Sequence, residues 1–312
     1  MNVLLFDIKR FALYDGKGIR TTLFFMGCPL TCRWCQNPEG QTDTVALYYN
    51  PDKCINCGYC IDACPIGKIL PNIRQRFLPV PCKENCTACL SVCPSGAIKK
   101  VGESYSLDSL MKIIILDNDF YKISNGGVTC SGGEPLIHIS FIEQLAKKLK
   151  SENIDLSVET CGSVPWENFE RIIPLVSHFF YDIKIINNKL HREFTGIDNS
   201  LILDNFNKLL DRTKNITVRI PLIPLHTDTD ENIIDIIHFL KKSKLIEKGI
   251  SIELLPYNTL AETKYNKEGI NIPTIPKYSI NVKKEQTYSF LQGRKQMFIK
   301  NGFSNIRILS YE

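Results

Sequence analysis

Three cysteines near the start of the chain have a spacing that suits an iron–sulfur cluster. Cys28, Cys32 and Cys35 follow the pattern Cys-x3-Cys-x2-Cys, with no fourth cysteine close by. Because a four-iron cluster normally takes four thiolates, three would leave one iron open to a ligand from elsewhere in the chain or to an exogenous molecule. The alternative is a zinc knuckle or three unrelated buried thiols, although zinc sites usually pair two Cys-x2-Cys-type hooks.

Eight further cysteines form two runs between residues 54 and 93. The first run, Cys-x2-Cys-x2-Cys-x3-Cys-Pro, has the bacterial ferredoxin spacing, and the second has one extra residue in its first gap. In two-cluster ferredoxins the fourth cysteine of each run binds the cluster of the other run. We therefore predict two [4Fe-4S] clusters, one held by Cys54, Cys57, Cys60 and Cys93 and the other by Cys82, Cys86, Cys89 and Cys64.

The two predicted clusters suit an electron relay between an external reductant, of the flavodoxin or ferredoxin type, and the three-cysteine loop. A structural or docking role is the alternative. Zinc is disfavoured because the ending Cys-x3-Cys-Pro occurs twice. The two remaining cysteines, Cys130 and Cys161, have no ligand spacing, and we expect them to be small core or rim residues.

The elements that must position these residues alternate between strand and helix. Strands are predicted at 21–26, 154–159, 178–184, 216–221 and 250–255, with a glycine-rich strand end at 126–134. Helices are predicted after the N-cap residue Ser106 and at 141–150, 199–210 and 231–242, and a last helix and strand close the chain. Residues 271–284 are predicted to form a surface loop. Such alternation implies a parallel sheet with right-handed crossovers.

The predicted fold class is α/β: a partial (β/α)6 TIM-like barrel, open on one side, with an inserted ferredoxin-like two-[4Fe-4S] domain. Residues 1–45 and 104–312 form the barrel, and residues 46–103 form the insertion. The three-cysteine loop and several polar residues fall at or just past the carboxyl ends of strands, the rim where parallel barrels build their active sites. The count of six units leaves room for a seventh strand at either end.

The amino-acid composition limits the classes of partner that the protein is expected to bind. Among 312 residues, 38 basic and 33 acidic side chains are spread along the chain, and the net charge of +5 is too weak to argue for nucleic acid or a membrane. Asp7 and Lys9 interrupt the region where a secretory signal would need an apolar core. Thirteen cysteines without an export signal are more often metal ligands than disulfides. We therefore expect a cytoplasmic protein.

Taken together, the motifs resemble those of a known family. Trp34 before the last cysteine of the loop, and the turn Ser-Gly-Gly-Glu-Pro at 131–135, are similar to the signature of the radical S-adenosylmethionine (SAM) enzymes. The segments 15–22, 126–129 and 182–184, His191 with Thr195, and the Leu-Leu-Pro-Tyr segment at 254–257 resemble the glycyl-radical-enzyme activating enzymes. The insertion resembles that of the activases of glycerol or propanediol dehydratase, choline lyase, hydroxyproline dehydratase and arylacetate decarboxylases.

This resemblance implies a function and a protein partner. SAM would chelate the open iron, and an electron from the cluster would cleave it to methionine and a 5′-deoxyadenosyl radical. That radical would abstract a hydrogen atom from a glycine of a glycyl radical enzyme. The resemblance also implies three [4Fe-4S] clusters and a chain that is often monomeric. A radical SAM enzyme that modifies peptides or RNA is one alternative, although no cysteine follows Cys161. A non-enzymatic electron carrier is another.

The resemblance further implies roles for residues at the rim. Glu134 would hold the ammonium group of SAM and Lys184 its carboxylate, and Asn258 could bond its ribose. The full set expected to bind SAM is Trp34, Gln36, Gly132, Gly133, Glu134, Glu159, Thr160, Asp182, Lys184, Arg219 and Asn258. Within it, Glu159, Thr160 and Asp182 could hold a monovalent cation. The alternatives are a simple ion pair for Asp182 and Lys184, and a structural pair for Arg219.

Four positions depart from the family pattern. The family usually has His at Tyr14, Pro at Lys17, Gly at Leu225 and His at Asn258. None of these changes removes a cluster ligand, so we expect an active enzyme with an altered fit to its partner.

Overall fold

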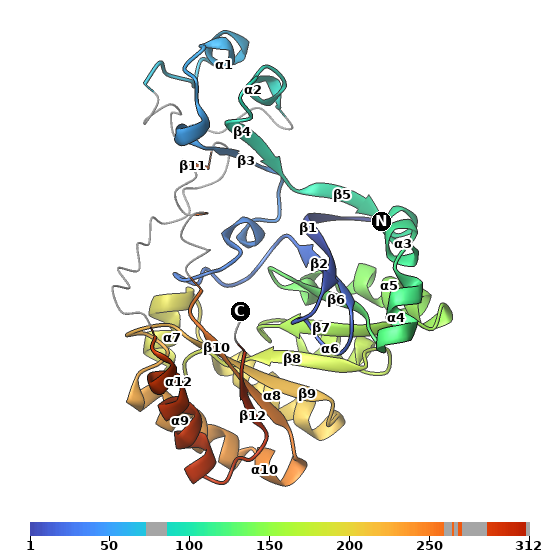
Figure 1. Ribbon diagram of the computed structural model, residues 1–312, viewed down its shortest axis with the longest axis vertical. Helices are drawn as coiled ribbons and strands as arrows, with labels where there is room; N and C mark the ends of the chain where they lie inside the picture. Colours follow the sequence, from blue (N-terminus) through green and yellow to red (C-terminus); the bar gives the residue numbers. More distant parts are fainter. Residues whose placement is uncertain (73–85, 259–263, 265–267, 270–285, 310–312) are drawn as a thin grey trace.

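The computed structural model of the protein describes residues 1–72, 86–258, 264, 268–269 and 286–309. Its main sheet has nine strands (Figure 1). Seven of them pair in parallel, in the spatial order β2 (Arg20–Phe25), β6 (Gly127–Gly132), β7 (Asp155–Thr160), β8 (His178–Asp182), β9 (Ile216–Leu222), β10 (Ser251–Pro256) and β12 (Ile306–Ile308). The predicted α/β fold with its parallel sheet is confirmed, and β12 supplies the seventh strand.

Two strands that the sequence did not predict extend the sheet beyond β2. β1 (Asn2–Ala12) pairs antiparallel with β2, and β5 (Glu103–Ser106) pairs antiparallel with β1. Among the described residues, β12 and β5 are therefore the two edges, and the barrel is open between them. The sequence of β1 begins with the apolar run Val-Leu-Leu-Phe at 3–6, which could have predicted this strand.

Helices cover the outer side of the sheet (Figure 1). They are α3 (Leu107–Ile115), α4 (Asn118–Ser124), α5 (Ile139–Ser151), α6 (Trp166–Ile172), α7 (Asn188–Thr195), α8 (Ser200–Arg212), α9 (Asp230–Lys242), α10 (Leu245–Lys248) and α12 (Tyr288–Lys300). The Ser106 hydroxyl accepts a hydrogen bond from the Ser109 amide at 3.1 Å, which confirms the predicted start of α3. Among the described helices, none is long and apolar enough to cross a membrane.

The two faces of the sheet differ in polarity because successive side chains of a strand point to opposite sides. Outward side chains such as Leu23, Val128, Cys130, Val158 and Val218 pack with the helices in one apolar core. Cys130 is completely buried there, as expected for a small core residue. Buried polar side chains at the alternate positions of these strands and of β10 include Thr22, Thr129, Ser131, Ser157, Thr217, Arg219 and Glu253. The inner face of the barrel is therefore rich in buried polar side chains.

A second, three-stranded sheet lies in the upper lobe of Figure 1. It consists of β3 (Ala46–Tyr49), β4 (Ile98–Val101) and β11 (Glu268–Gly269). The lobe also contains α1 (Tyr59–Ala63) and α2 (Ala88–Ser91), and an apolar cluster of its own around Leu47 and Tyr49. The sequence did not predict β11, which brings the C-terminal half of the chain to this sheet. The predicted loop at 271–284 lies outside the described residues.

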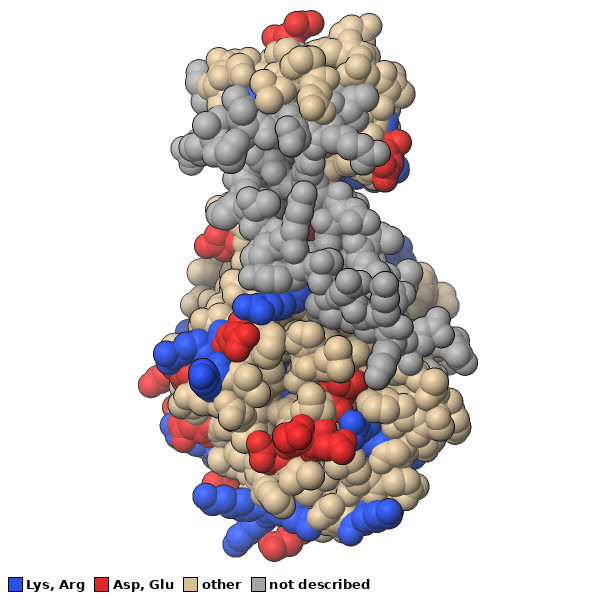
Figure 2. Space-filling view, turned by 90° about the vertical axis from the view of Figure 1, so that its left-hand side faces the viewer, with Lys and Arg blue, Asp and Glu red and all other residues tan. Residues whose placement is uncertain are grey.

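Within the described ranges, three short 3-10 helices complete the connections. They are η1 (Pro38–Gln41) after the three-cysteine loop, η2 (Pro51–Lys53) before the first cysteine run, and η4 (Pro135–His138) after β6. Basic and acidic side chains are interspersed over the barrel face seen in Figure 2. This mixture agrees with the modest net charge of the sequence.

Candidate active site

The loop with the three cysteines begins directly after β2, at the carboxyl rim of the barrel. Cys28, Cys32 and Cys35 are free thiols and belong to one apolar cluster with Trp34 and Cys161. Burial raises the pKa of Cys32, and it raises the pKa of Cys35 to about 12. Both thiols thus stay protonated until a metal displaces the proton.

The three thiols lie in one apolar cluster, where the ligands of a single iron–sulfur cluster would have to meet. Among the described residues, no three His, Cys, Asp or Glu side chains converge closely enough to hold one ion. In a four-iron cluster each thiolate binds a different iron, so the sulfur atoms are farther apart. Cys32 is buried, and Cys28 and Cys35 are partly exposed, so their role as cluster ligands stays a prediction.

The end of α7 holds the cysteine loop in place. The amide of Thr31 donates to the carbonyl of Thr195 at 2.8 Å, and the amide of Arg33 donates to the carbonyl of Phe194 at 3.0 Å. Gly196 follows with a φ of 90°, and a side chain there would meet the Thr31 hydroxyl. The family-like segment around Thr195 therefore has a physical role: the carbonyl groups that α7 leaves unbonded anchor the loop.

The turn after β6 packs against the same loop. The amide of Gly133 donates to the carbonyl of Phe25 at 2.8 Å, and the amide of Glu134 donates to the carbonyl of Gly27 at 2.7 Å. A Cβ atom at Gly133 would overlap the carbonyl oxygens of Gly27 and Gly40. The sequence analysis expected Gly133 to bind SAM. The close approach of the backbone at Gly27 and Gly40 already requires a glycine at this position.

We expect Gly133→Ala to lower the free energy of unfolding by about 1–3 kcal/mol, the usual range for overpacking, because the rigid backbone of the cysteine loop must move. Gly293→Ala is the matched control, since Gly293 lies in α12 with no atom within 4 Å of the added methyl group. Alanine favours a helix over glycine, so the control should gain up to about 1 kcal/mol. Anaerobic urea unfolding measures both changes, and equal stability of the two variants would contradict the packing argument.

Glu134 faces into the protein. Its side chain is 0% exposed. Its carboxylate accepts hydrogen bonds from the amide of Leu136 at 3.0 Å, the hydroxyl of Thr160 at 2.9 Å and the amide of Cys161 at 2.7 Å. Burial raises the pKa of Glu134. Glu134 and Thr160 thus join the ends of β6 and β7, and their predicted contacts with SAM and a cation stay predictions.

Asp182 and Lys184 lie at the end of β8 beside the thiols. The Lys184 ammonium group is 2.7 Å from Asp182 Oδ2, and its side chain is only 10% exposed. Burial alone would lower the pKa of Lys184, but the Asp182 carboxylate raises it above its usual value. Asp182 and Lys184 thus form the ion pair that was the alternative to a role in binding SAM. The pair places a buried positive charge next to the cysteine loop.

A network of buried charged side chains lies on the inner face of the barrel, below the rim. Arg219 donates to Glu253 Oε2 at 2.8 Å, to Glu159 Oε1, and to the carbonyl of Tyr14 at 3.0 Å. Its guanidinium group lies 4.0 Å from the centre of the Phe180 ring. Burial alone would lower the pKa of Arg219, and the two carboxylates raise it. The guanidinium group of Arg219 therefore donates its hydrogen bonds to groups of the protein, as the alternative of a structural ion pair implies. A contact between Arg219 and SAM stays a prediction.

Cys161 joins the site although its spacing did not predict a role. Its thiol hydrogen-bonds to the sulfur of Cys28, and this bond lowers the pKa of Cys28. The expected rim position is correct, since Cys161 directly follows β7. This position at the rim was the feature of the sequence from which the place of Cys161 beside the cysteine loop could have been predicted.

We expect Cys161→Ala to lower the reduction potential of a cluster bound at Cys28, because hydrogen bonds to ligand sulfur stabilise the reduced, more negative state. The iron content should not change. A potentiometric titration followed by electron paramagnetic resonance (EPR) measures the shift. Cys130→Ala, which removes a buried thiol from the outer core, should leave the potential unchanged. Equal potentials in the two variants would rule out the tuning role.

The remaining predicted SAM contacts lie around the loop. Trp34 is buried, with ring centres 6.2 Å from Phe194 and 6.1 Å from His226. Gln36 is exposed, and Asn258 is half-buried just past β10. No further contact assigns these three residues to a ligand, so their roles stay predictions.

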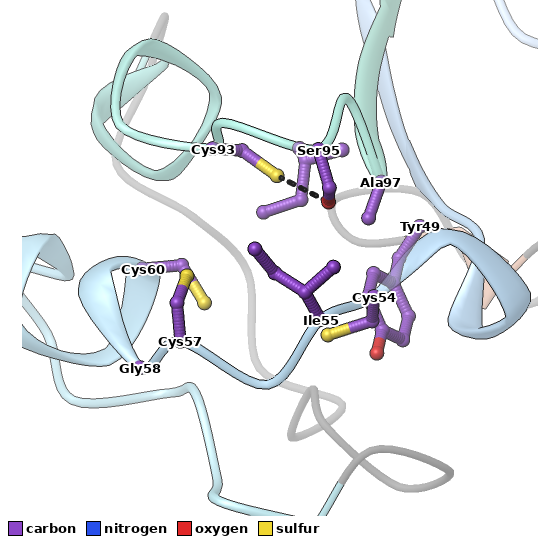
Figure 3. A pocket seen from close by; sticks show the side chains of 10 residues that line it. Tyr49, Cys54, Ile55, Cys57, Gly58, Cys60, Cys93, Ser95 and Ala97 are labelled. Carbon is purple, nitrogen blue, oxygen red and sulfur yellow. Dashed lines mark hydrogen bonds between the residues drawn. The ribbon is translucent and has the colours of Figure 1, made fainter.

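In the upper lobe, the predicted ligands of one cluster surround a single cavity (Figure 3). Cys54, Cys57, Cys60 and Cys93 line it, and its volume is about 20 Å³. The four cysteines come from both runs, and the predicted exchange of the fourth ligand stays a prediction. Of the second set, Cys64 and Cys89 pack in the same apolar cluster, and Cys86 is partly exposed. Cys82 lies outside the described residues.

Comparisons with known proteins agree with this site. The radical SAM superfamily model matches residues 79–240, and the 4Fe-4S binding domain model matches residues 47–67. The chain is 35% identical to the isethionate sulfite-lyase activating enzyme of Desulfovibrio desulfuricans, covering 86% of this chain and 88% of that protein. It is 40% identical to the trans-4-hydroxy-L-proline dehydratase activating enzyme of Clostridioides difficile, with the same coverage of 86% and 88%.

A longer match extends over the whole fold. The 4-hydroxyphenylacetate decarboxylase activating enzyme of Clostridioides difficile is 34% identical, with 96% of this chain and 94% of that protein covered. Such identity over nearly the full length includes both the barrel and the cysteine-rich lobe. The chain therefore belongs to the glycyl-radical-enzyme activating enzymes of the radical SAM superfamily.

Proposed function

We propose that this enzyme uses SAM and one electron to abstract a hydrogen atom from a backbone glycine of a partner glycyl radical enzyme. The observation that carries the proposal is the meeting of three free thiols, the turn at Gly133 and the Lys184 ammonium group at one rim. When bound, the iron–sulfur cluster supplies the electron that cleaves SAM to methionine and a 5′-deoxyadenosyl radical. The protein supplies the ligands, the orientation and the exclusion of water.

Individual residues support this division of work. Cys28, Cys32 and Cys35 would hold the cluster and leave one iron for the amino acid part of SAM. Lys184 would give its carboxylate a positive partner, and Asp182 holds that ammonium group in place. A monovalent cation beside Asp182 and Glu159 is part of the proposal, since both carboxylates lie near this rim.

The cysteine-rich lobe would contribute two more [4Fe-4S] clusters. We propose that residues 46–103 form an inserted domain, with β11 as its third strand, within a barrel of residues 1–45 and 104–312. The cavity lined by four thiols supports the first additional cluster. The lobe would pass electrons from a flavodoxin or ferredoxin-type donor to the SAM cluster. We propose a cytoplasmic, monomeric enzyme; none of the twelve described cysteines forms a disulfide within the chain.

The substrate is proposed to be a protein loop. The barrel is open between β12 and β5, and a chain segment with a glycine could reach the thiols from there. The relatives named above activate a lyase, a dehydratase and a decarboxylase, and we propose a partner of this kind. The exposed Leu225, with a φ of 67°, lies on the rim after β9 and would face such a partner.

Anaerobic reconstitution tests the proposal. About twelve irons per chain, release of 5′-deoxyadenosine with dithionite and SAM, and a glycyl radical EPR signal on an added partner enzyme are the expected results. A partner with that glycine changed to alanine is the control. Cleavage of SAM without a radical on any glycyl radical enzyme would favour a peptide- or RNA-modifying enzyme. Eight irons and no cleavage would favour an electron carrier.

A further inference from the structure

A second cavity lies between the cysteine loop and the small sheet. Its volume is about 130 Å³, and Glu39 of η1 and Tyr48 of β3 line it from the two sides. The lining also contains three lysines from separate segments, Lys53, Lys99 and Lys264. The cluster chemistry described above uses none of these five side chains.

Tyr48 presents an unused donor to this cavity. Its side chain is 6% exposed, and its buried hydroxyl has no hydrogen-bond partner in the part of the chain that the structure describes. Burial raises the pKa of Tyr48, so the hydroxyl keeps its proton. A buried donor left without an acceptor costs about 1–3 kcal/mol. The site therefore lacks an acceptor.

The register of the small sheet explains both the cavity and its charge. Tyr48 lies opposite Lys99 on β4, so the two side chains share one face of the sheet. On its other side Tyr48 lies opposite Gly269 of β11, which has no side chain to fill the space.

The charges of the lining do not balance. Lys264 lies 2.8 Å from Glu39 Oε1 and also donates to Asn37 Oδ1 at 3.2 Å. This pair uses the one carboxylate of the lining, while Lys53 and Lys99 add two positive charges without an acidic partner among the lining residues. A water molecule could also bond the Tyr48 hydroxyl, whereas an anion would in addition pair with the exposed ammonium groups of Lys53 and Lys99.

We propose that this cavity binds a small oxyanion of the sulfate or phosphate class. The ion would accept a hydrogen bond from the Tyr48 hydroxyl and pair with the ammonium groups of Lys99 and Lys53. Such an ion has acceptor oxygens in several directions and fits a volume of about 130 Å³. It would tie β3 and β4 to η1, which follows the ligand Cys35 by three residues. It would therefore stabilise the junction between the lobe and the cysteine loop.

Calorimetric titration of the anaerobic holoenzyme with sodium sulfate tests this site, with sodium chloride at equal ionic strength as the reference. Saturable binding of one sulfate per chain is expected. Lys99→Gln should weaken it at least about tenfold, the effect of losing one charge-assisted hydrogen bond. Lys100→Gln is the matched control, because it removes the same charge from the same strand, on the opposite face beside Leu47. It should bind sulfate like the parent protein.

Tyr48→Phe gives a second, independent result. In chloride its unfolding midpoint should equal or exceed that of the parent protein, because the lost hydroxyl had no partner. In sulfate it should bind more weakly and gain less stability than the parent. Heats that do not saturate, equal weakening by Lys99→Gln and Lys100→Gln, or a Tyr48→Phe variant destabilised in chloride would each overturn the proposal.

Discussion

Cys28→Ala is expected to abolish the reductive cleavage of SAM and to remove about four of about twelve irons per chain. Cys28 is one of only three thiols in the loop, so its loss leaves the cluster with two ligands. The thiols of the upper lobe bind their irons independently, since Cys54, Cys57, Cys60 and Cys93 surround a separate cavity. Iron counting and chromatographic detection of 5′-deoxyadenosine, both under anaerobic conditions, measure the two effects.

Cys130→Ala is the matched control for this experiment. It removes a thiol that is completely buried in the outer core, next to the same rim but away from the loop. Iron content and 5′-deoxyadenosine formation should be those of the parent protein. Cleavage that survives in Cys28→Ala, or an equal loss in Cys130→Ala, would show that the loop is not the SAM site.

Arg219→Met is expected to lower the free energy of unfolding by about 3–5 kcal/mol, the usual cost of breaking a buried ion pair. The substitution leaves Glu159 and Glu253 without their shared guanidinium group, and Glu253 is completely buried. Arg307 also pairs with Glu253, so Glu159 is left with the larger loss. Denaturant unfolding of the holoenzyme, monitored by circular dichroism without oxygen, measures the change.

Arg212→Met provides the comparison, because Arg212 pairs with Glu170 on the surface with both side chains about half exposed. Exposed pairs contribute about 0–1 kcal/mol. The double variant Arg219→Met with Glu159→Gln removes one uncompensated charge and should regain part of the lost stability. If Arg219→Met costs no more than Arg212→Met but raises the KM for SAM, Arg219 acts on SAM rather than on the network.

Short-range patterns in the sequence predicted the candidate cluster ligands and the rim on which they lie. Cys28, Cys32 and Cys35 lie within eight residues, so their spacing already limits how far apart their sulfur atoms can be. The alternation of strands and helices placed this loop and Asp182 at the same rim, because parallel strands all end on one side. Both predictions depend on local geometry or on a rule that all such folds share.

Contacts between distant segments were decided only by the tertiary structure. Cys161 meets Cys28, Arg219 bonds to Glu159, and β11 pairs with β3 across more than 200 residues. The sequence contains no spacing that links such partners, since each contact depends on how neighbouring strands are aligned. Glu134 shows the same limit. Its motif predicted an acceptor for a ligand, but the folded chain brings three donors of its own to that carboxylate.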